Sequence, residues 1–258
     1  MESSESGSAP HRLNLAAIVS IGLLLLAWQV ASFFLPEFIV PGLQLIALEF
    51  VKMFEEGTLL SDSFLTLVRV MLGLIGGFIF GGTLGLLMGL VRRSEGYLMP
   101  LINFVMGVPA LSWTLIVILW FRGTETRIFA LMLAVSFPVF AHSVLDAVKG
   151  VSRELLEMTL AFRPTRTQVL RLLILPSIVP SILTAWKVSI GFAVRVVIVA
   201  ELVGASTGVG YRMVQQQSLL NMSGVLAWTL VLVLMGLALQ GLITKSEQTL
   251  LKWRPAAH

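Results

Sequence analysis

Three charged residues interrupt a stretch that is otherwise apolar enough to cross a membrane. Lys187, Arg195 and Glu201 all fall within residues 176–203. A charge at the centre of a bilayer costs about 2.5–3.5 kcal/mol on translocon scales, so it must face water, protein or another charge. Lys187 and Arg195 are roughly 80° apart on a helix, which lets them share one broad face. Either that face lines a polar path, or Lys187 extends to the interface and Glu201 pairs with a cation from a loop.

Two further residues belong to the candidate path. His142 is the one histidine inside a predicted span, where it either contacts a solute or proton or forms an interior hydrogen bond. Trp113 either faces a solute or anchors the chain at the membrane interface. The candidate translocation path therefore comprises Lys187, Arg195, Trp113 and His142.

No catalytic constellation emerges from the other residue types. The sequence contains neither a phosphate-loop motif nor HExxH, and it has no cysteine. The histidines His11, His142 and His258 are far apart, and no serine has a plausible histidine and carboxylate partner. We therefore expect a protein that is not an enzyme, with no metal and no cofactor on this chain.

The composition predicts that this chain lies in a lipid bilayer. Hydrophobic residues make up 57% of the 258 residues and charged residues only 12%, against about 25% charged in soluble domains. A spanning helix needs about 20 mostly apolar residues. The sequence therefore predicts an all-α membrane protein with about six transmembrane helices: 13–36, 70–91, a span within 96–121 interrupted by Pro100 and Pro109, 128–145, 176–203, and a span within 213–244 that begins near residue 225.

The polar connections predict domain limits and orientation. Loops on the N-terminal side of the membrane carry eleven Lys and Arg residues and the other side five, with Arg69 counted among the five. This bias predicts that both termini are cytoplasmic. We expect a disordered tail over 1–12, a transmembrane domain over 13–247, a C-terminal tail over 248–258, and an amphipathic helix over 45–57 that lies on the membrane surface or packs on the spans. The net charge of +4 fits this arrangement with membrane lipid, and we expect no nucleic acid partner.

A glycine stripe runs along the second predicted span. Its members recur every four residues, at Gly73, Gly77, Gly81, Gly85 and Gly89. Small residues at this spacing let another backbone approach closely in lipid. The stripe predicts either packing within the chain or a helix that slides against a neighbour.

The longest loop on the N-terminal side, 148–175, is predicted to contain two short helices. Ser152 can cap the first helix, Arg163–Pro164 interrupts it, and Pro164 can open the second at its first position. Such a pair of helices is either a docking element or an ordered connector.

This loop resembles the EAA loop of binding-protein-dependent ABC importer permeases. Glu157 matches the family's Glu, and Leu175–Pro176 match its Leu-Pro, with Leu173 at the Ile position. Met158 and Thr159 replace the two alanines, and Arg163 replaces the glycine. The resemblance implies an ATPase-docking loop made of Glu154, Leu155, Leu156, Glu157, Met158, Leu160, Arg163, Pro164, Leu175 and Pro176.

The stretches GVPALSWTLIVILWFRGTETRIF, AELVGASTGVGYRM and LLKWR resemble the sulfonate, taurine and nitrate branch of the same permeases. The resemblance implies a type I ABC importer permease fold in a bacterial inner membrane. It also implies the following partners: two copies of an ABC ATPase that bind ATP and Mg, a periplasmic or lipid-anchored solute-binding protein, and a second permease copy in a homodimer. The expected solute is a small anion such as a sulfonate, taurine, nitrate or a related organic acid. An aromatic or vitamin-precursor solute is the alternative, and a secondary transporter or channel is the rival class.

Overall fold

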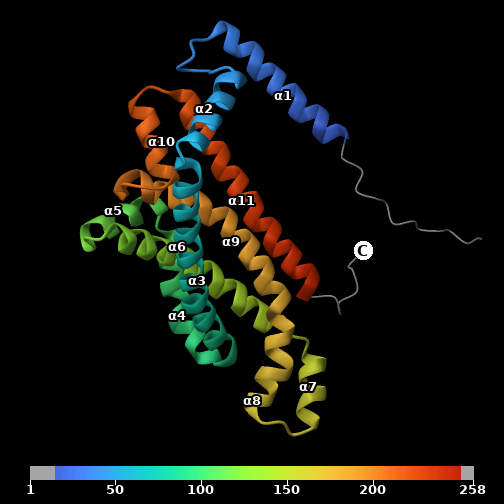
Figure 1. The fold of residues 1–258 in the computed structure, drawn as a ribbon. Coiled ribbons are helices and arrows are strands. Elements are labelled where there is room, and N and C mark those ends of the chain that lie inside the picture. The colour runs from blue at the N-terminus through green and yellow to red at the C-terminus, as the bar shows by residue number, and fades with distance from the viewer. Residues whose placement is uncertain (1–14, 251–258) are drawn as a thin grey trace, which may run out of the picture.

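The computed structural model describes residues 15–250, and every regular element in this part is a helix (Figure 1). The elements are α1 (Leu15–Phe34), α2 (Leu43–Glu55), α3 (Thr58–Leu90), α4 (Arg92–Gly107), α5 (Ala110–Trp120), α6 (Thr124–Lys149), α7 (Arg153–Ala161), α8 (Arg166–Val169), a π-helical turn (Leu170–Ile174), α9 (Leu175–Gly204), α10 (Val209–Ser218) and α11 (Met222–Leu250). The prediction of an all-α protein is confirmed for the described residues.

Four helices are long and apolar enough to cross a membrane. They are α3, α6, the continuous helix Arg166–Gly204 that includes α9, and α11. The pair α4 and α5 is apolar enough to add a fifth span but is bent by 96°. Helix α1 contains an apolar stretch, Ile18–Phe34, that is shorter than the length required of a candidate span. Six spans with cytoplasmic termini therefore stay a prediction, and residues 1–14 and 251–258, with most of the predicted tails, lie outside the described part.

Some observed helices are longer than the predicted spans because polar residues near their ends have partners within the protein. Helix α3 begins at Thr58, twelve residues before the predicted start, and continues through Asp62, Thr66 and Arg69, which are buried with partners. Helix α11 continues to Leu250, past the predicted boundary at 247. Pro100 lies within α4, whereas the chain breaks at Val108–Pro109, where Val108 is extended as expected before proline.

Helix α2 packs on the protein with one face and exposes apolar side chains on the other. It buries Met53 against its neighbours α3 and α11 and exposes Leu48, Val51 and Phe54. The predicted amphipathic helix is thus present, and one side of it packs on the spans while the other stays open.

Helices α3 and α6 form the most extensive helix pair, and the glycine stripe lies between them. A Cβ at Gly81 would overlap the carbonyl group of Phe137, and one at Gly85 would overlap that of Ala141. The other stripe glycines lie against side chains of Met132, Ser136 and Val148. The stripe therefore serves close backbone packing within the chain.

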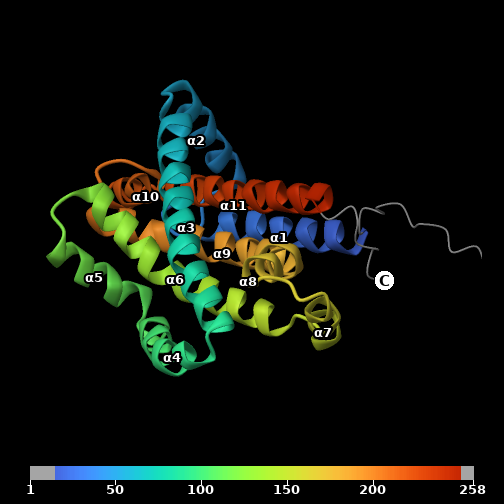
Figure 2. The same cartoon turned by 90° about the horizontal axis from the view of Figure 1, so that it is seen from below.

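The remaining helices define the two ends of the bundle. Helices α7 and α8 project together from one end, and α2 and α10 lie at the other (Figure 1). Helix α1 diverges from the bundle in Figure 1, and it makes few contacts with any other helix. Seen from below, α4 and α5 lie to one side of the bundle, away from α11 (Figure 2).

Candidate functional site

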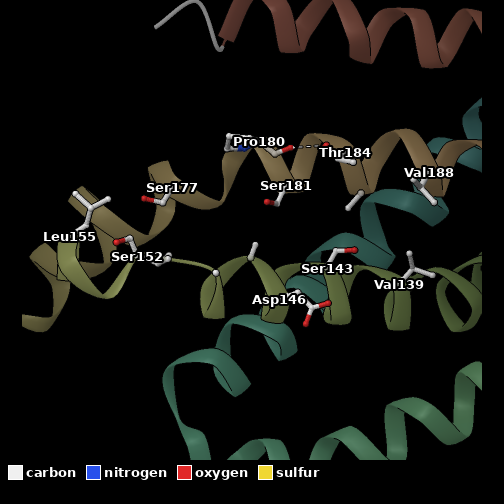
Figure 3. A pocket seen from close by; sticks show the side chains of 14 residues that line it. Val139, Ser143, Asp146, Ser152, Leu155, Ser177, Pro180, Ser181, Thr184 and Val188 are labelled. Carbon is white, nitrogen blue, oxygen red and sulfur yellow. Dashed lines mark hydrogen bonds between the residues drawn. The ribbon is translucent and has the colours of Figure 1, made fainter. Parts of the chain in front are cut away.

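A cavity of about 750 Å³ lies between α6 and α9, beside the start of α7. Its walls carry hydroxyl groups that point toward the space between the two helices, as Figure 3 shows for Ser143 on α6 and Ser177 and Ser181 on α9. None of these three hydroxyls has a hydrogen-bond partner among the described residues, whereas Thr184 donates to the carbonyl of Pro180 (3.1 Å). We call this space the α6/α9 cavity. Its free hydroxyls can exchange hydrogen bonds with water or a polar solute.

Helical spacing places these side chains on one face. Ser177, Ser181, Thr184 and Val188 recur at intervals of three and four residues along α9, which is the spacing of a single helix stripe. On α6 the same spacing aligns Val139, Ser143 and Asp146, and Gly150 follows just beyond the end of this helix. The sequence analysis missed this site because hydroxyl-bearing residues in membrane helices often bond only to their own backbone.

A second cavity, of about 450 Å³, opens where the chain bends between α4 and α5. We call it the Trp113 chamber; it is lined by Val105, Met106, Val108, Ala110, Trp113, Val135, Val139, Val188, Ser189 and Phe192. It shares Val139 and Val188 with the α6/α9 cavity, so the two spaces adjoin. These lining residues are apolar except for Trp113, whose indole donates to the carbonyl of Val105 (3.3 Å), and Ser189.

Ser189 is the exceptional polar group of this chamber. Its side chain is 2% exposed, and its hydroxyl has no hydrogen-bond partner. A buried hydroxyl without a partner costs about 1–3 kcal/mol on mutational scales. Its oxygen has almost no accessible surface, so this hydroxyl is unpaired but is not open to a molecule in the chamber.

The structure separates the four predicted path residues. Trp113 lines the chamber, whereas Lys187 pairs with Glu247 of α11. His142 hydrogen-bonds Asn103 of α4 (2.9 Å) and lines neither cavity. Arg195 borders a separate groove of about 310 Å³ between α9 and α11 and has no ion-pair or hydrogen-bond partner among the described residues.

Arg195 nevertheless continues the polar stripe of α9. It lies five full turns after Ser177 and within about 40° of Ser181 and Val188 around the helix axis, at 100° per residue. Lys187 lies well off this stripe, which explains why it reaches α11 instead. The spacing of Lys187 and Arg195 alone did not predict that the first would be paired and the second unpaired.

Glu201 is fully buried and belongs to a charge cluster at the α10 end of the bundle. It accepts hydrogen bonds from Nη1 of Arg69 (2.7 Å), Oγ1 of Thr66 (2.9 Å) and the backbone N–H of Gly210 (2.9 Å). Arg69 also donates from Nε to Glu125 on α6 (2.9 Å). The sequence analysis expected a loop cation for Glu201 and counted Arg69 as one; Arg69 instead lies in α3, where its side chain is buried.

The same cluster holds the start of α10. The backbone N–H of Gly208 donates to Asp62 (2.7 Å), and Nε of Arg212 donates to the other Asp62 oxygen (2.8 Å). Gly208 has φ +110°, and a Cβ there would come within 2.5 Å of the Glu201 carboxylate. Only glycine fits this backbone and this contact.

Helix α7 is largely exposed, and only Leu156 and Thr159 are partly covered. None of its residues is buried, and Leu155, Met158 and Leu160 are each about half exposed, with Phe162 just beyond at 82%. Ser152 occupies the N-cap position, as predicted, but its side chain makes no capping hydrogen bond. This short helix therefore leaves an apolar surface uncovered by the described part of the chain.

The turn after α7 corrects one expectation. Pro164 does not open the second helix; Thr165 is its N-cap, with a reciprocal capping box to Gln168, and the helix begins at Arg166. Arg163 has φ +49°, a left-handed conformation that glycine adopts most easily. The geometry that the glycine of the EAA pattern would supply is therefore present here with arginine.

The membrane entry at Leu175–Pro176 is not a helix break. A π-helical turn, Leu170–Ile174, precedes it, and the N–H of Leu175 bonds to the carbonyl of Leu170. Pro176 has no N–H to donate, so a widened turn next to it lets the helix continue from Arg166 to Gly204. The second half of the 148–175 loop, from Arg166 onward, and the cavity-lining helix are therefore one continuous element.

Residues 77–252 match the family model described as "Binding-protein-dependent transport system inner membrane component". The chain is 31% identical over 217 residues to the putative aliphatic sulfonates transport permease protein SsuC of Bacillus subtilis (strain 168), covering 84% of this chain and 78% of the relative. It is 30% identical over 252 residues to the taurine transport system permease protein TauC of Escherichia coli (strain K12), covering 93% and 91%.

Solved structures share the fold. An inward-facing MetNI methionine ABC transporter matches with TM-score 0.61 at 18% identity, covering 74% of this chain and 97% of that chain. An amino acid ABC transporter matches with TM-score 0.64 at 18% identity, covering 78% and 98%.

The chain therefore belongs to the inner membrane components of binding-protein-dependent transport systems. It is a multi-pass permease subunit of an ABC importer and so a transport component of the membrane.

Proposed function

We propose that this permease forms half of the translocation path for a small anionic solute, with a second copy of the chain forming the other half. Three features lie along or beside one stripe of α9. The α6/α9 cavity supplies hydroxyl groups, the Trp113 chamber supplies an apolar wall, and Arg195 supplies one unpaired cation. The similarity to an aliphatic sulfonate and a taurine permease supports a sulfonate or related organic acid as the solute. His142 and Lys187 stay candidates that act from outside these cavities.

The position of α7 supports the proposal that transport is coupled to ATP hydrolysis by a partner subunit. Helix α7 has no buried residue and lies at the end of the continuous helix that lines the α6/α9 cavity. A partner that moves α7 would therefore act on the cavity wall. We assign the loop of Glu154, Leu155, Leu156, Glu157, Met158 and Leu160 to docking of an ATPase subunit, two copies of which would bind ATP and Mg for the dimer.

The remaining assignments follow from this one. The α7 end is cytoplasmic, both termini lie on that side, and α1 supplies the sixth span in the bacterial inner membrane. The α10 end then faces the periplasm, where a solute-binding protein delivers the solute.

A second candidate solute class is aromatic or a vitamin precursor. The indole and the largely apolar wall of the Trp113 chamber favour it, and the chain is also 26% identical to the formylaminopyrimidine transport permease protein ThiX of Halalkalibacterium halodurans. A secondary transporter would need a free intramembrane acid. Glu201 and Asp62 are each held by an arginine, whereas Asp146, at the edge of its span, lines the α6/α9 cavity without a cation partner among the described residues. The family match argues against this rival class.

Co-purification tests the proposed function. The permease is expressed with the ATPase and the solute-binding protein that are proposed as its partners, purified in detergent and reconstituted. We expect a complex with equal numbers of permease and ATPase chains whose ATP hydrolysis rises with loaded binding protein. A permease that purifies without the ATPase, or hydrolysis that does not respond to loaded binding protein, would contradict the assignment.

A further inference from the structure

We infer that Arg163 determines which ATPase subunit this permease accepts, by binding a carboxylate in a docking groove that also has an apolar slot. This inference rests on the proposed function and adds the chemistry of the partner surface. Arg163 lies in the connection between α7 and α8, which forms the outermost part of the α7 end (Figure 1). We call this connection, residues 162–165, the docking tip.

The backbone of Arg163 has a conformation that favours glycine. Its φ of +49° is left-handed, and it follows Phe162, the C-cap residue of α7. Its N–H donates to the carbonyl of Leu160 (2.9 Å) and closes the last turn of the helix. Glycine is the common residue at this position and the residue of the EAA pattern, because any other side chain costs free energy there. Such a departure from easy backbone geometry indicates a functional constraint on the side chain.

The Arg163 side chain has no use within the described part of the chain. It is exposed and forms no ion pair or hydrogen bond there, and the same holds for Arg166 and Arg171. Residues 158–200 contain no Asp or Glu, so the nearest acid before the tip is Glu157. The docking tip and the start of the next helix are therefore locally cationic and complement an acidic partner surface.

Phe162 supplies an apolar contact beside this cation. Its side chain is 82% exposed, and Met158 and Leu160 behind it are about half exposed. Aromatic residues and arginine are the types enriched in protein interfaces. A complementary surface would hold the ring in an apolar slot and the guanidinium against a carboxylate, which it can bind through two parallel hydrogen bonds.

The length of the helix that follows the tip favours a protein partner over lipid. The continuous helix Arg166–Gly204 has 39 residues and is about 58 Å long at 1.5 Å per residue. A bilayer with its headgroups is about 40–45 Å thick. Gly204 lies at the α10 end, where Thr124 at the start of α6 donates to its carbonyl (3.2 Å). The docking tip therefore stands beyond the headgroups on the other side, away from lipid phosphates.

Affinity measurements with the ATPase subunit test this inference on the full-length permease in phosphatidylcholine nanodiscs. Arg163→Gly removes the guanidinium and suits the backbone, so the isolated permease should melt at the same or a higher temperature. Its affinity for the ATPase should fall about tenfold or more, as expected for the loss of one hydrogen bond to a charged group. The affinity should also become less sensitive to salt.

Two further variants separate charge from backbone. Arg163→Asn also tolerates the left-handed conformation and should lose affinity as Arg163→Gly does. Arg163→Lys keeps the charge and should keep the salt dependence. The matched control is Arg122→Gly, an exposed and unpaired arginine in the connection between α5 and α6 at the opposite end, which should not change the affinity.

Arg163→Lys also allows the partner group to be identified. Residues 150–186 contain no lysine, so any amine coupled within this stretch belongs to the introduced side chain. A carbodiimide joins an amine to a carboxylate in direct contact, with loss of water. We expect mass spectrometry of the treated complex to find position 163 joined to an Asp or Glu of the ATPase.

Unchanged affinity of both Arg163→Gly and Arg163→Asn would overturn the inference, and so would the absence of a coupled carboxylate in the Arg163→Lys complex. A loss of affinity that appears only when phosphatidylglycerol replaces phosphatidylcholine would assign Arg163 to anionic lipid instead. In each of these cases the wild-type permease still binds the ATPase, which leaves the proposed function standing. A wild-type permease that binds no ATPase would contradict that function itself.

Discussion

Nη1 of Arg69 on α3 lies 2.7 Å from Oε1 of Glu201 on α9, and neither side chain is more than 3% exposed. This pair joins two spans near the α10 end, and Gly210 and Thr66 supply further donors to the same carboxylate. The buried charge is therefore compensated on every side that the structure describes. Its position, beside the backbone that starts α10, makes it a structural clamp and not part of the path.

Removing one partner of this clamp should be strongly destabilising. Arg69→Met leaves Glu201 buried without its cation, and breaking a buried pair in this way costs about 3–5 kcal/mol. We expect a large fall in the melting temperature of the detergent-purified protein. The double variant Arg69→Met with Glu201→Leu should be more stable than Arg69→Met alone, because no charge is stranded. A double variant that melts lower still would contradict the clamp.

The Arg212–Asp62 ion pair can be compared with the Arg69–Glu201 pair, because both join an arginine to a buried carboxylate at the same end of the bundle. Arg212 is 29% exposed, so water screens part of its interaction. Arg212→Met should therefore lower the melting temperature less than Arg69→Met does. Equal losses would mean that burial of the pair is not what sets its contribution.

Close packing at the glycine stripe predicts that a large side chain lowers stability where a glycine faces another backbone and not where it faces open space. Gly81→Leu would drive a side chain into the backbone of Phe137, whereas Gly96→Leu meets nothing within 4 Å. Overpacking typically costs about 1–3 kcal/mol. We expect a lower melting temperature and reduced uptake for Gly81→Leu only. Unchanged behaviour of Gly81→Leu would mean that α3 and α6 do not approach as the structure describes.

The sequence predicted the positions of the helices well, but it predicted their ends and the partners of their side chains less well. Apolar runs of about 20 residues identify α6 and α9 because lipid exposure demands them. The start of α3 at Thr58 was missed because Asp62 and Arg69 look like loop residues until their partners are known. The partner of Arg69 lies 132 residues away, and no local pattern encodes that distance.

The candidate site was also predictable only in part, because local sequence signals mark some of its residues and not others. Trp113 and the Pro109 interruption pointed to the bend beside the chamber, and Glu157 with Leu175–Pro176 pointed to the docking loop. Ser189 gave no signal, since a serine in a span usually bonds to its own helix, and only the packing of α5, α6 and α9 leaves its hydroxyl without a partner.

The two cations of α9 should behave differently in transport. Arg195 is unpaired and continues the hydroxyl stripe, so Arg195→Ala should reduce uptake of an anionic solute into proteoliposomes while leaving assembly intact. Lys187 is paired with Glu247, so Lys187→Ala should lower stability more than it lowers uptake per assembled complex. Undiminished uptake by Arg195→Ala would remove this residue from the path.

The proposed orientation makes opposite predictions for two loops. A reporter fused at Gly123, between α5 and α6, should be active in the periplasm, and one fused at Arg166, at the start of α8, should be active in the cytoplasm. The physical reason is the excess of Lys and Arg in the loops on the α7 side. A reversed pattern would exclude docking of a cytoplasmic ATPase at α7.

Substitutions in α7 test the dock itself. Leu156 and Glu157 lie at the middle of a helix in which no side chain is buried, so changes there should not disturb the fold. Leu156→Asp puts a charge into the apolar contact surface, and Glu157→Lys reverses the charge that matches the family pattern. We expect both variants to retain the melting temperature of the isolated permease and to lose solute-stimulated ATP hydrolysis, with weaker ATPase co-purification for Leu156→Asp. Glu56→Lys, an exposed charge reversal next to α2 at the opposite end, is the control and should keep both properties. If the two α7 variants keep wild-type stoichiometry and stimulated hydrolysis, the ATPase docks elsewhere, because an interface with this helix at its centre could not tolerate a buried aspartate.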